Sequence, residues 1–76
     1  MTINAILVTG GFDPLHSGHI KLLKDAHTFN NNVIVGLNSD EWLSRKKGKP
    51  FMPYKERESI LKELKCVHKV ISFNDN

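Results

Sequence analysis

The sequence predicts an α/β fold in which helices join the strands of a parallel sheet. Two short apolar runs, residues 5–9 and 33–37, have the composition and length of buried strands. Between them, apolar residues recur at helical spacing from Ile20 to Phe29. Because strands alternate with helices, we expect βαβ units with right-handed crossovers.

The first part of the chain accounts for one complete βαβ unit. The strand over residues 5–9 ends at two glycines, which signal a turn. A helix is expected from Ser17 to about Phe29, where three asparagines follow. The second strand, residues 33–37, is almost continuously apolar, which predicts a parallel strand covered on both faces.

The second part adds two helices and a strand. Ser39 is placed to cap a short helix, and a loop with glycine and proline follows at residues 47–53. A third helix is expected from near Pro53 to about Lys65, and a third strand over residues 67–73. Strand, helix, strand, two helices and strand form one half of a Rossmann-like sheet.

Length makes this half-sheet a structural problem. The chain has 76 residues, which allows at most one small domain. In a full sheet of this type the first strand is central. A sheet apparently truncated after the third strand therefore leaves the first as an exposed apolar edge. We expect the chain to need either a homo-oligomer or a completing chain.

Composition excludes several classes of protein. The chain carries 11 Lys and Arg against 8 Asp and Glu, a net charge of +3 that does not by itself distinguish among anionic partners. Its one cysteine, Cys66, excludes an internal disulfide framework and a four-cysteine zinc site. No apolar run approaches the roughly 20 residues that span a bilayer. We expect a cytoplasmic protein with neither nucleic acid nor a membrane as its partner.

Residues 10–19, between the first strand and the first helix, contain the highest density of candidate functional residues. His16 precedes the helix and His19 lies in its first turn, where free backbone N–H groups favour phosphate. The segment is not a P-loop, because no lysine follows Gly18, and it lacks the dinucleotide fingerprint. Two histidines alone supply too few ligands for a metal, so no metal-ligating residue is predicted.

Residues 11–19 resemble the signature of the cytidylyltransferase-like nucleotidyltransferases, which is His-x-Gly-His after a Gly-x-Phe-Asp turn. The resemblance continues through residues 38–40, the basic segment 45–50 and the helix start 53–57. The subgroups most similar are glycerol-3-phosphate cytidylyltransferase and heptose-1-phosphate adenylyltransferase. The resemblance identifies residues 1–76 as the N-terminal half of such a domain.

The resemblance implies a reaction and a set of roles. A phosphorylated polyol or sugar would attack the α-phosphorus of CTP or ATP, take up CMP or AMP and release pyrophosphate, with Mg²⁺ bridging phosphates. Lys46 would neutralise phosphate charge from a mobile basic loop. The implied catalytic residues are His16, His19, Lys46 and Arg57, and the implied nucleotide-binding residues are Gly10, Gly11, Phe12, Asp13, Gly18 and Asp40.

The residues by themselves leave alternatives open. Arg57 begins the apolar stripe of its helix, so its inward-facing charge needs an anion, which is either a phosphate or a structural ion-pair partner. Without the resemblance, Lys46 is better explained as a residue of a solvated loop, whereas Asp13 could equally fix a turn and Asp40 could equally belong to a first helical turn. The alternative function is a truncated, non-catalytic module that binds nucleotide or phosphate, or that serves assembly.

Overall fold

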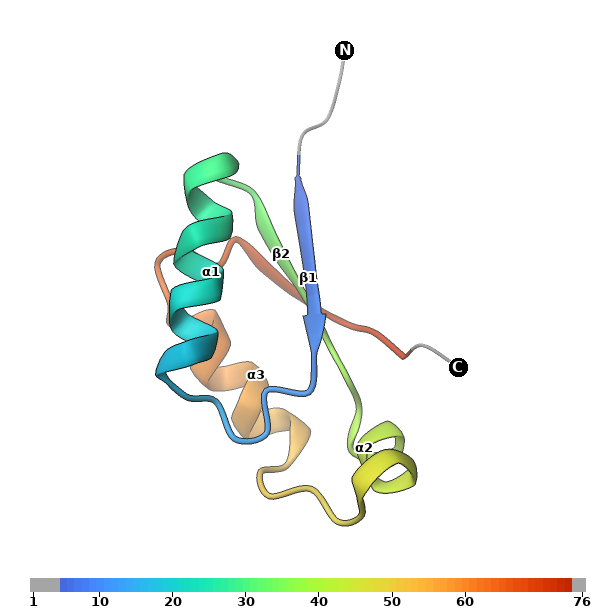
Figure 1. Ribbon diagram of the computed structural model, residues 1–76. Coiled ribbons are helices and arrows are strands. Elements are labelled where there is room, and N and C mark those ends of the chain that lie inside the picture. The colour runs from blue at the N-terminus through green and yellow to red at the C-terminus, as the bar shows by residue number, and fades with distance from the viewer. Residues whose placement is uncertain (1–4, 75–76) are drawn as a thin grey trace.

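The computed structural model describes residues 5–74 and confirms the α/β fold (Figure 1). The elements follow the predicted order, and they are β1 (Ile6–Gly10), α1 (Ser17–Phe29), β2 (Val33–Leu37), α2 (Asp40–Lys47), α3 (Tyr54–Lys62) and β3 (Lys69–Ser72). No helix within residues 5–74 has both the length and the apolar character that crossing a bilayer requires.

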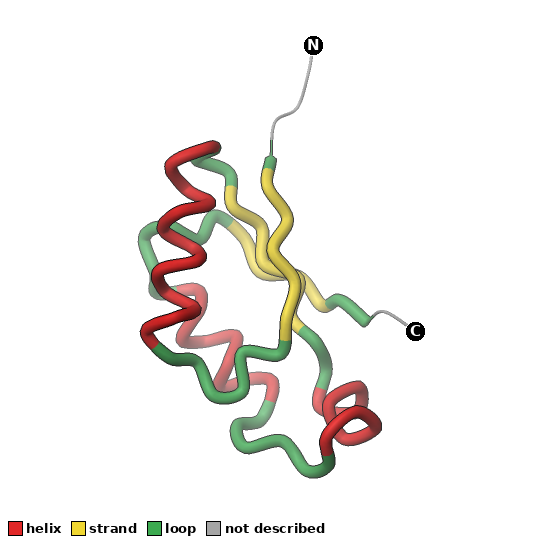
Figure 2. The backbone as a smooth tube through the Cα atoms, in the orientation of Figure 1, coloured by secondary structure: helices red, strands yellow, loops and turns green. Residues whose placement is uncertain are grey.

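The three strands form one parallel sheet in the order β1-β2-β3 (Figure 2). Ile6 pairs with Val33, and Ile34 pairs with Lys69. In the described part of the chain β1 therefore lies at an edge of the sheet, as the sequence predicts. The carboxyl ends of β1 and β2 are joined one step further by a hydrogen bond from the Asn38 N–H to the Gly10 carbonyl, at 3.1 Å.

The hydrophobic core lies between the helices and one face of the sheet. Val33, Val35 and Leu37 of β2 are fully buried, and they pack with Leu23 of α1 and Leu61 of α3. The connection from β1 to β2 and the connection from β2 to β3 each lead to the next strand in the same direction across the sheet. Because such connections are right-handed, α1 and α3 lie on the same face (Figure 1).

The other face of the sheet has no helix over it within residues 5–74. Alternation along the strands directs Leu7 and Ile71 toward it, and these side chains are 53% and 36% exposed. The prediction that the second strand is covered on both faces holds only in part for the described residues, because Gly36 on this face is buried and Ile34 half-buried but no helix lies over them. Its run of apolar residues reflects deep burial on one face and only partial cover on the other.

The end of α3 also differs from the prediction, because the helix stops at Lys62 and β3 starts at Lys69. The Leu64 N–H bonds back to the Leu61 carbonyl at 3.2 Å, and this tighter turn ends the helix. The turn brings Cys66 into the core, 9% exposed, as predicted for a buried apolar side chain.

Candidate active site

Three loops meet at the carboxyl edge of the sheet, where ligands bind in open α/β folds (Figure 1). They are the segments between β1 and α1, between β2 and α2, and between α2 and α3. An open pocket of about 370 Å³ lies there, and its lining comes from the first loop, the first turn of α1 and α2. The lining residues are Gly11, Phe12, Asp13, Pro14, His16, His19, Leu43 and Lys47.

The two signature histidines build the start of α1. The Gly18 N–H donates to Nδ1 of His16 at 3.0 Å, and the His16 N–H donates to Nδ1 of His19 at 3.2 Å. This is a reciprocal capping box in which two imidazoles replace the usual hydroxyl and carboxylate. The rings stack with centroids 3.9 Å apart.

This geometry fixes which ring nitrogen each histidine offers to a ligand. A neutral imidazole that accepts a hydrogen bond at Nδ1 carries its proton at Nε2. His16 and His19 therefore each have an Nε2–H donor that the capping box does not use. Burial lowers the pKa of His19 from its usual value, and the charge of the adjacent His16 lowers it further. His19 is consequently a neutral donor at pH 7.

Two predicted glycines leave room for the site's side chains. A Cβ on Gly18 would lie 2.9 Å from the His16 ring, so a larger residue would push that ring from its cap. A Cβ on Gly11 would lie 2.8 Å from the side chain of Leu43, so α2 packs directly on the first loop.

Phe12 and Gly10 pack on the core side of the first loop. Phe12 has a positive φ of 49° and is 4% exposed, so its side chain packs in the core while the residue also forms part of the pocket lining. Its ring meets the His19 ring edge to face, with centroids 4.8 Å apart. Gly10, the last residue of β1, lies against the Phe12 ring. Direct contact of these residues with nucleotide stays a prediction.

Asp13 holds the α2–α3 loop against the first loop. Its side chain is 1% exposed, and its carboxylate accepts the N–H groups of Phe51 at 2.7 Å and Met52 at 2.5 Å. Burial alone would raise its pKa, but the N–H groups of Phe51 and Met52, together with Lys47, outweigh this and lower it. Asp13 thus holds the α2–α3 loop in addition to its own turn.

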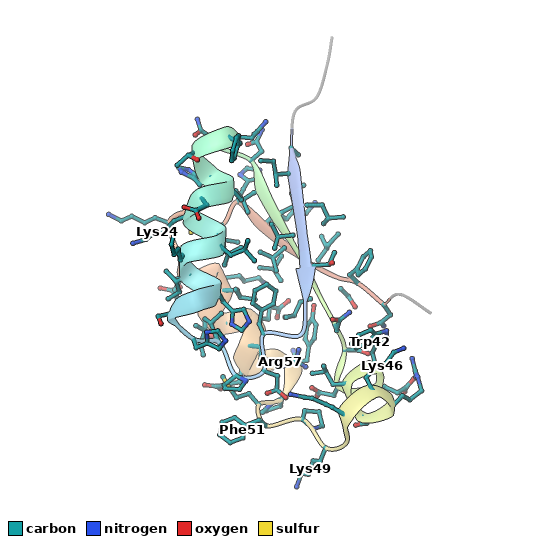
Figure 3. The ribbon with its side chains drawn as sticks, viewed as in Figure 1. Lys24, Trp42, Lys46, Lys49, Phe51 and Arg57 are labelled. Carbon is teal, nitrogen blue, oxygen red and sulfur yellow. The ribbon has the colours of Figure 1, made fainter. Side chains whose placement is uncertain are left out.

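Arg57 is fully buried and joins all three loops (Figure 3). Its guanidinium donates to the carbonyls of Met52 at 2.9 Å, Gly11 at 2.9 Å and Asn38 at 2.7 Å, and to the Asp40 carboxylate at 2.6 Å. The anion that the inward-facing arginine requires is therefore supplied by Asp40, which is the structural alternative. A contact between Arg57 and triphosphate stays a prediction.

The structure corrects the position of Lys46. Residues 45–47 belong to the last turn of α2 and not to a mobile basic loop. The Lys46 ammonium lies 5.4 Å from the centre of the Trp42 ring (Figure 3). Lys46 does not line the pocket, whereas Lys47 does.

Two residues of the site were not predicted. Lys47 lies four residues after buried Leu43, and this spacing is the signal that places it on the pocket side of α2. Asn38 is 4% exposed and donates from Nδ2 to the Phe73 carbonyl at 2.7 Å. Its position at the carboxyl end of a buried strand is the corresponding signal.

The pocket does not fit a protein-bound magnesium ion. Magnesium usually takes one or two carboxylates together with substrate phosphates. The carboxylate that lines this pocket belongs to Asp13, which is buried and already occupied by its donors. Among residues 5–74, no group of three or more His, Cys, Asp or Glu side chains is placed to hold a metal.

Known proteins resemble this chain over nearly all of its length. Residues 7–76 match the cytidylyltransferase-like family. The bifunctional protein HldE of Geotalea uraniireducens is 42% identical over 73 residues, which cover 93% of this chain and 15% of that protein. HldE of Helicobacter pylori is 40% identical over 73 residues, again 93% of this chain and 16% of that protein.

A solved structure resembles the fold. The lipopolysaccharide core biosynthesis protein from Thermoplasma volcanium superimposes with a TM-score of 0.84 at 28% identity, over 92% of this chain and 57% of that one. The chain thus spans about 15% of the HldE relatives and somewhat over half of the structural neighbour. A family match that extends over residues 7–76 shows that the chain belongs to the cytidylyltransferase-like family.

Proposed function

We propose that this chain carries the phosphate-binding side of a nucleotidyltransferase active site. In the reaction, an oxygen of the acceptor's phosphate attacks the α-phosphorus of a nucleoside triphosphate. The bond from that phosphorus to the oxygen bridging it to the β-phosphorus breaks, and pyrophosphate leaves with the bonding electrons. The observation that carries the proposal is the pair of Nε2–H donors at the start of α1.

The proposed catalysis consists of positioning and charge stabilisation. Negative charge shifts onto the α-phosphate oxygens and the leaving pyrophosphate, and hydrogen bonds from His16 and His19 would strengthen as it develops. Because the capping box already orients both rings, little reorganisation accompanies the reaction. The N-terminus of α1 adds a favourable potential for the same anion.

The acceptor we propose is a phosphorylated sugar, with a phosphorylated polyol as the other option. The lipopolysaccharide core named for the structural neighbour is a sugar-containing polymer, which supports the sugar. The nucleotide is CTP or ATP, and we expect magnesium to arrive bound to its phosphates. The further walls of the site would come from a second copy, a completing chain or the rest of a longer gene product.

A non-catalytic module is the second candidate function. The sheet face around Leu7 and Ile71 has no helix over it in the described residues, and such a face suits assembly. In this case the histidine pocket would bind phosphate without turnover. Pyrophosphate release separates this candidate from the first.

The assay measures pyrophosphate release from CTP or ATP with magnesium and a panel of phosphorylated sugars and polyols. We expect turnover with one nucleotide–acceptor pair, and a loss of roughly 10²–10³-fold in kcat for His16→Ala or His19→Ala. His68→Ala is the matched control, because His68 is exposed and remote from the pocket, and it keeps the wild-type rate. Turnover that survives the double variant His16→Ala/His19→Ala would overturn the assigned roles.

A further inference from the structure

The last turn of α2 presents two adjacent lysines to different surroundings. Leu43 packs against the first loop, so the residue one helical turn later lies over that loop, and this residue is Lys47. Lys46 follows Trp42 by one turn and lies over its ring. The rotation of the helix, and not the order of the basic residues, decides which ammonium reaches the histidine pocket.

We propose that Lys47, and not Lys46, is the residue of α2 that binds the triphosphate at the His16–His19 pocket. This proposal rests on the proposed function, because it names a further ligand of the same substrate. Lys47 lines the pocket together with both histidines. It supplies a permanent positive charge beside the hydrogen bonds that the two imidazoles donate from Nε2.

The ammonium of Lys47 is held in place before any ligand binds. Its Nζ donates to the Asp13 carbonyl at 2.8 Å and lies 3.0 Å from the Asp13 carboxylate. An ammonium group has three N–H donors, so these two contacts leave one for a phosphate oxygen. A pre-positioned charge loses less side-chain entropy on binding than a free lysine does.

The unequal exposure of Lys47 and Asp13 presents the ammonium, and not the carboxylate, to a ligand in the pocket. The Asp13 side chain is 1% exposed, whereas the Lys47 side chain is 45% exposed. An anion in the pocket therefore meets the ammonium, while the carboxylate stays occupied by the N–H groups of Phe51 and Met52. Asp13 acts here as a positioning residue for Lys47 and for the loop.

The first test measures binding of inorganic triphosphate to the 76-residue chain by isothermal titration calorimetry. Lys47→Gln keeps a hydrogen-bond donor for Asp13 and removes the charge. We expect it to weaken binding at least about tenfold, because a hydrogen bond from a charged donor is lost. Lys47→Arg restores most of the affinity, and Lys46→Gln stays within about threefold of the wild type.

Stability separates a structural role from a binding role. Urea unfolding followed by circular dichroism reports whether Lys47→Gln is folded. If it is not, the test compares the triphosphate affinities of Lys47→Arg and Lys46→Gln. A role confined to bracing the loop would leave triphosphate affinity unchanged in every folded variant. That result, or a greater loss with Lys46→Gln, or no triphosphate binding by the wild type, would overturn the proposal.

The second test repeats the comparison with pyrophosphate release as the readout. Turnover that depends on Lys46 and not on Lys47 overturns the role of Lys47 and leaves the proposed function standing. Absence of turnover, with triphosphate binding that still depends on Lys47, overturns the function and leaves the phosphate ligand standing.

Discussion

The histidines of the signature use their two ring nitrogens for different purposes. The Nδ1 atoms of His16 and His19 complete the hydrogen bonding at the start of α1, and the Nε2 atoms remain for a ligand. The residues that start the helix therefore also form the binding site, and Gly18 between them gives the ring of His16 its space. One short motif thus couples the stability of α1 to the chemistry of the pocket.

This coupling predicts that the free energy of unfolding falls as the pH drops below about 6.5. Burial and the charge of His16 lower the pKa of folded His19, so the unfolded chain binds more protons in that range. Protonation at Nδ1 also removes the acceptor of the His16 N–H. The stabilisation is complete above pH 6.5 and is lost as the pH falls through the lowered pKa.

Urea unfolding at pH 7.5, 6.5 and 5.5 measures this dependence. His19→Asn keeps an oxygen that can accept the His16 N–H but does not titrate, so we expect a shallower pH dependence than in the wild type. His68→Asn removes an exposed histidine and keeps the wild-type dependence. Equal slopes for the wild type and His19→Asn would contradict the explanation.

Single residues were predictable from the sequence where the local motif determines them. His16 and His19 could be placed at the helix start because the cap is formed by residues three positions apart. The contrast between Lys46 and Lys47 could not be predicted in this way. It depends on how α2 is rotated against the first loop, and that rotation follows from a contact between Gly11 and Leu43, which lie far apart in the sequence.

At the scale of elements, Arg57 at the start of α3 joins the ends of β1 and β2 to the α2–α3 loop. It makes four hydrogen bonds to these segments while fully buried. The sequence predicts that this arginine faces inward, but it leaves open which anion it meets. Asp40 meets it because Ser39 caps α2, accepting the Trp42 N–H at 3.1 Å, and so fixes where that helix begins.

We predict that Arg57→Met lowers the free energy of unfolding by about 3–5 kcal/mol, because it leaves buried carbonyls and the Asp40 carboxylate without their donor. Arg45→Met is the matched control. Arg45 and Glu41 both lie on α2 and form an exposed ion pair at 3.5 Å. Its loss lowers the free energy of unfolding by about 0.5 kcal/mol. Urea unfolding measures both variants.

Because Arg57→Met risks unfolding the chain altogether, Arg57→Lys serves as the graded variant. It keeps the charge but replaces the planar fork by a single ammonium, so we expect a stability between those of Arg57→Met and the wild type. If Arg57→Met and Arg45→Met proved equally stable, the three loops would not depend on this arginine.

The boundaries of the elements were predicted less well than their order. The order follows from apolar periodicity, which is a local property. The ends of α3 and β3 follow from the need to bury Cys66 and Val67 against the sheet, and this depends on contacts that are distant in the sequence. The core that results is continuous, but it occupies one side of the molecule.

At the scale of the whole molecule, the sheet is unevenly covered. One face packs against α1 and α3, and the other presents Leu7, Ile71 and the unpaired edge of β1 in the described part of the chain. The sequence predicts the exposed edge, because the strand order follows from the crossovers. It did not predict the uncovered face, because the apolar composition of a strand does not show whether a given side chain is buried within the chain or left exposed.

We therefore predict that the 76-residue chain self-associates through this face. Sedimentation velocity across a concentration series measures the association, which we expect to weaken in Leu7→Thr/Ile71→Thr, since threonine keeps the β-preference and removes apolar surface. Phe29→Ser is the matched control, because Phe29 is 84% exposed at the end of α1, and it leaves the association unchanged. A wild-type chain that sediments as a monomer throughout, or one that depends on Phe29, would mean that this face does not drive assembly.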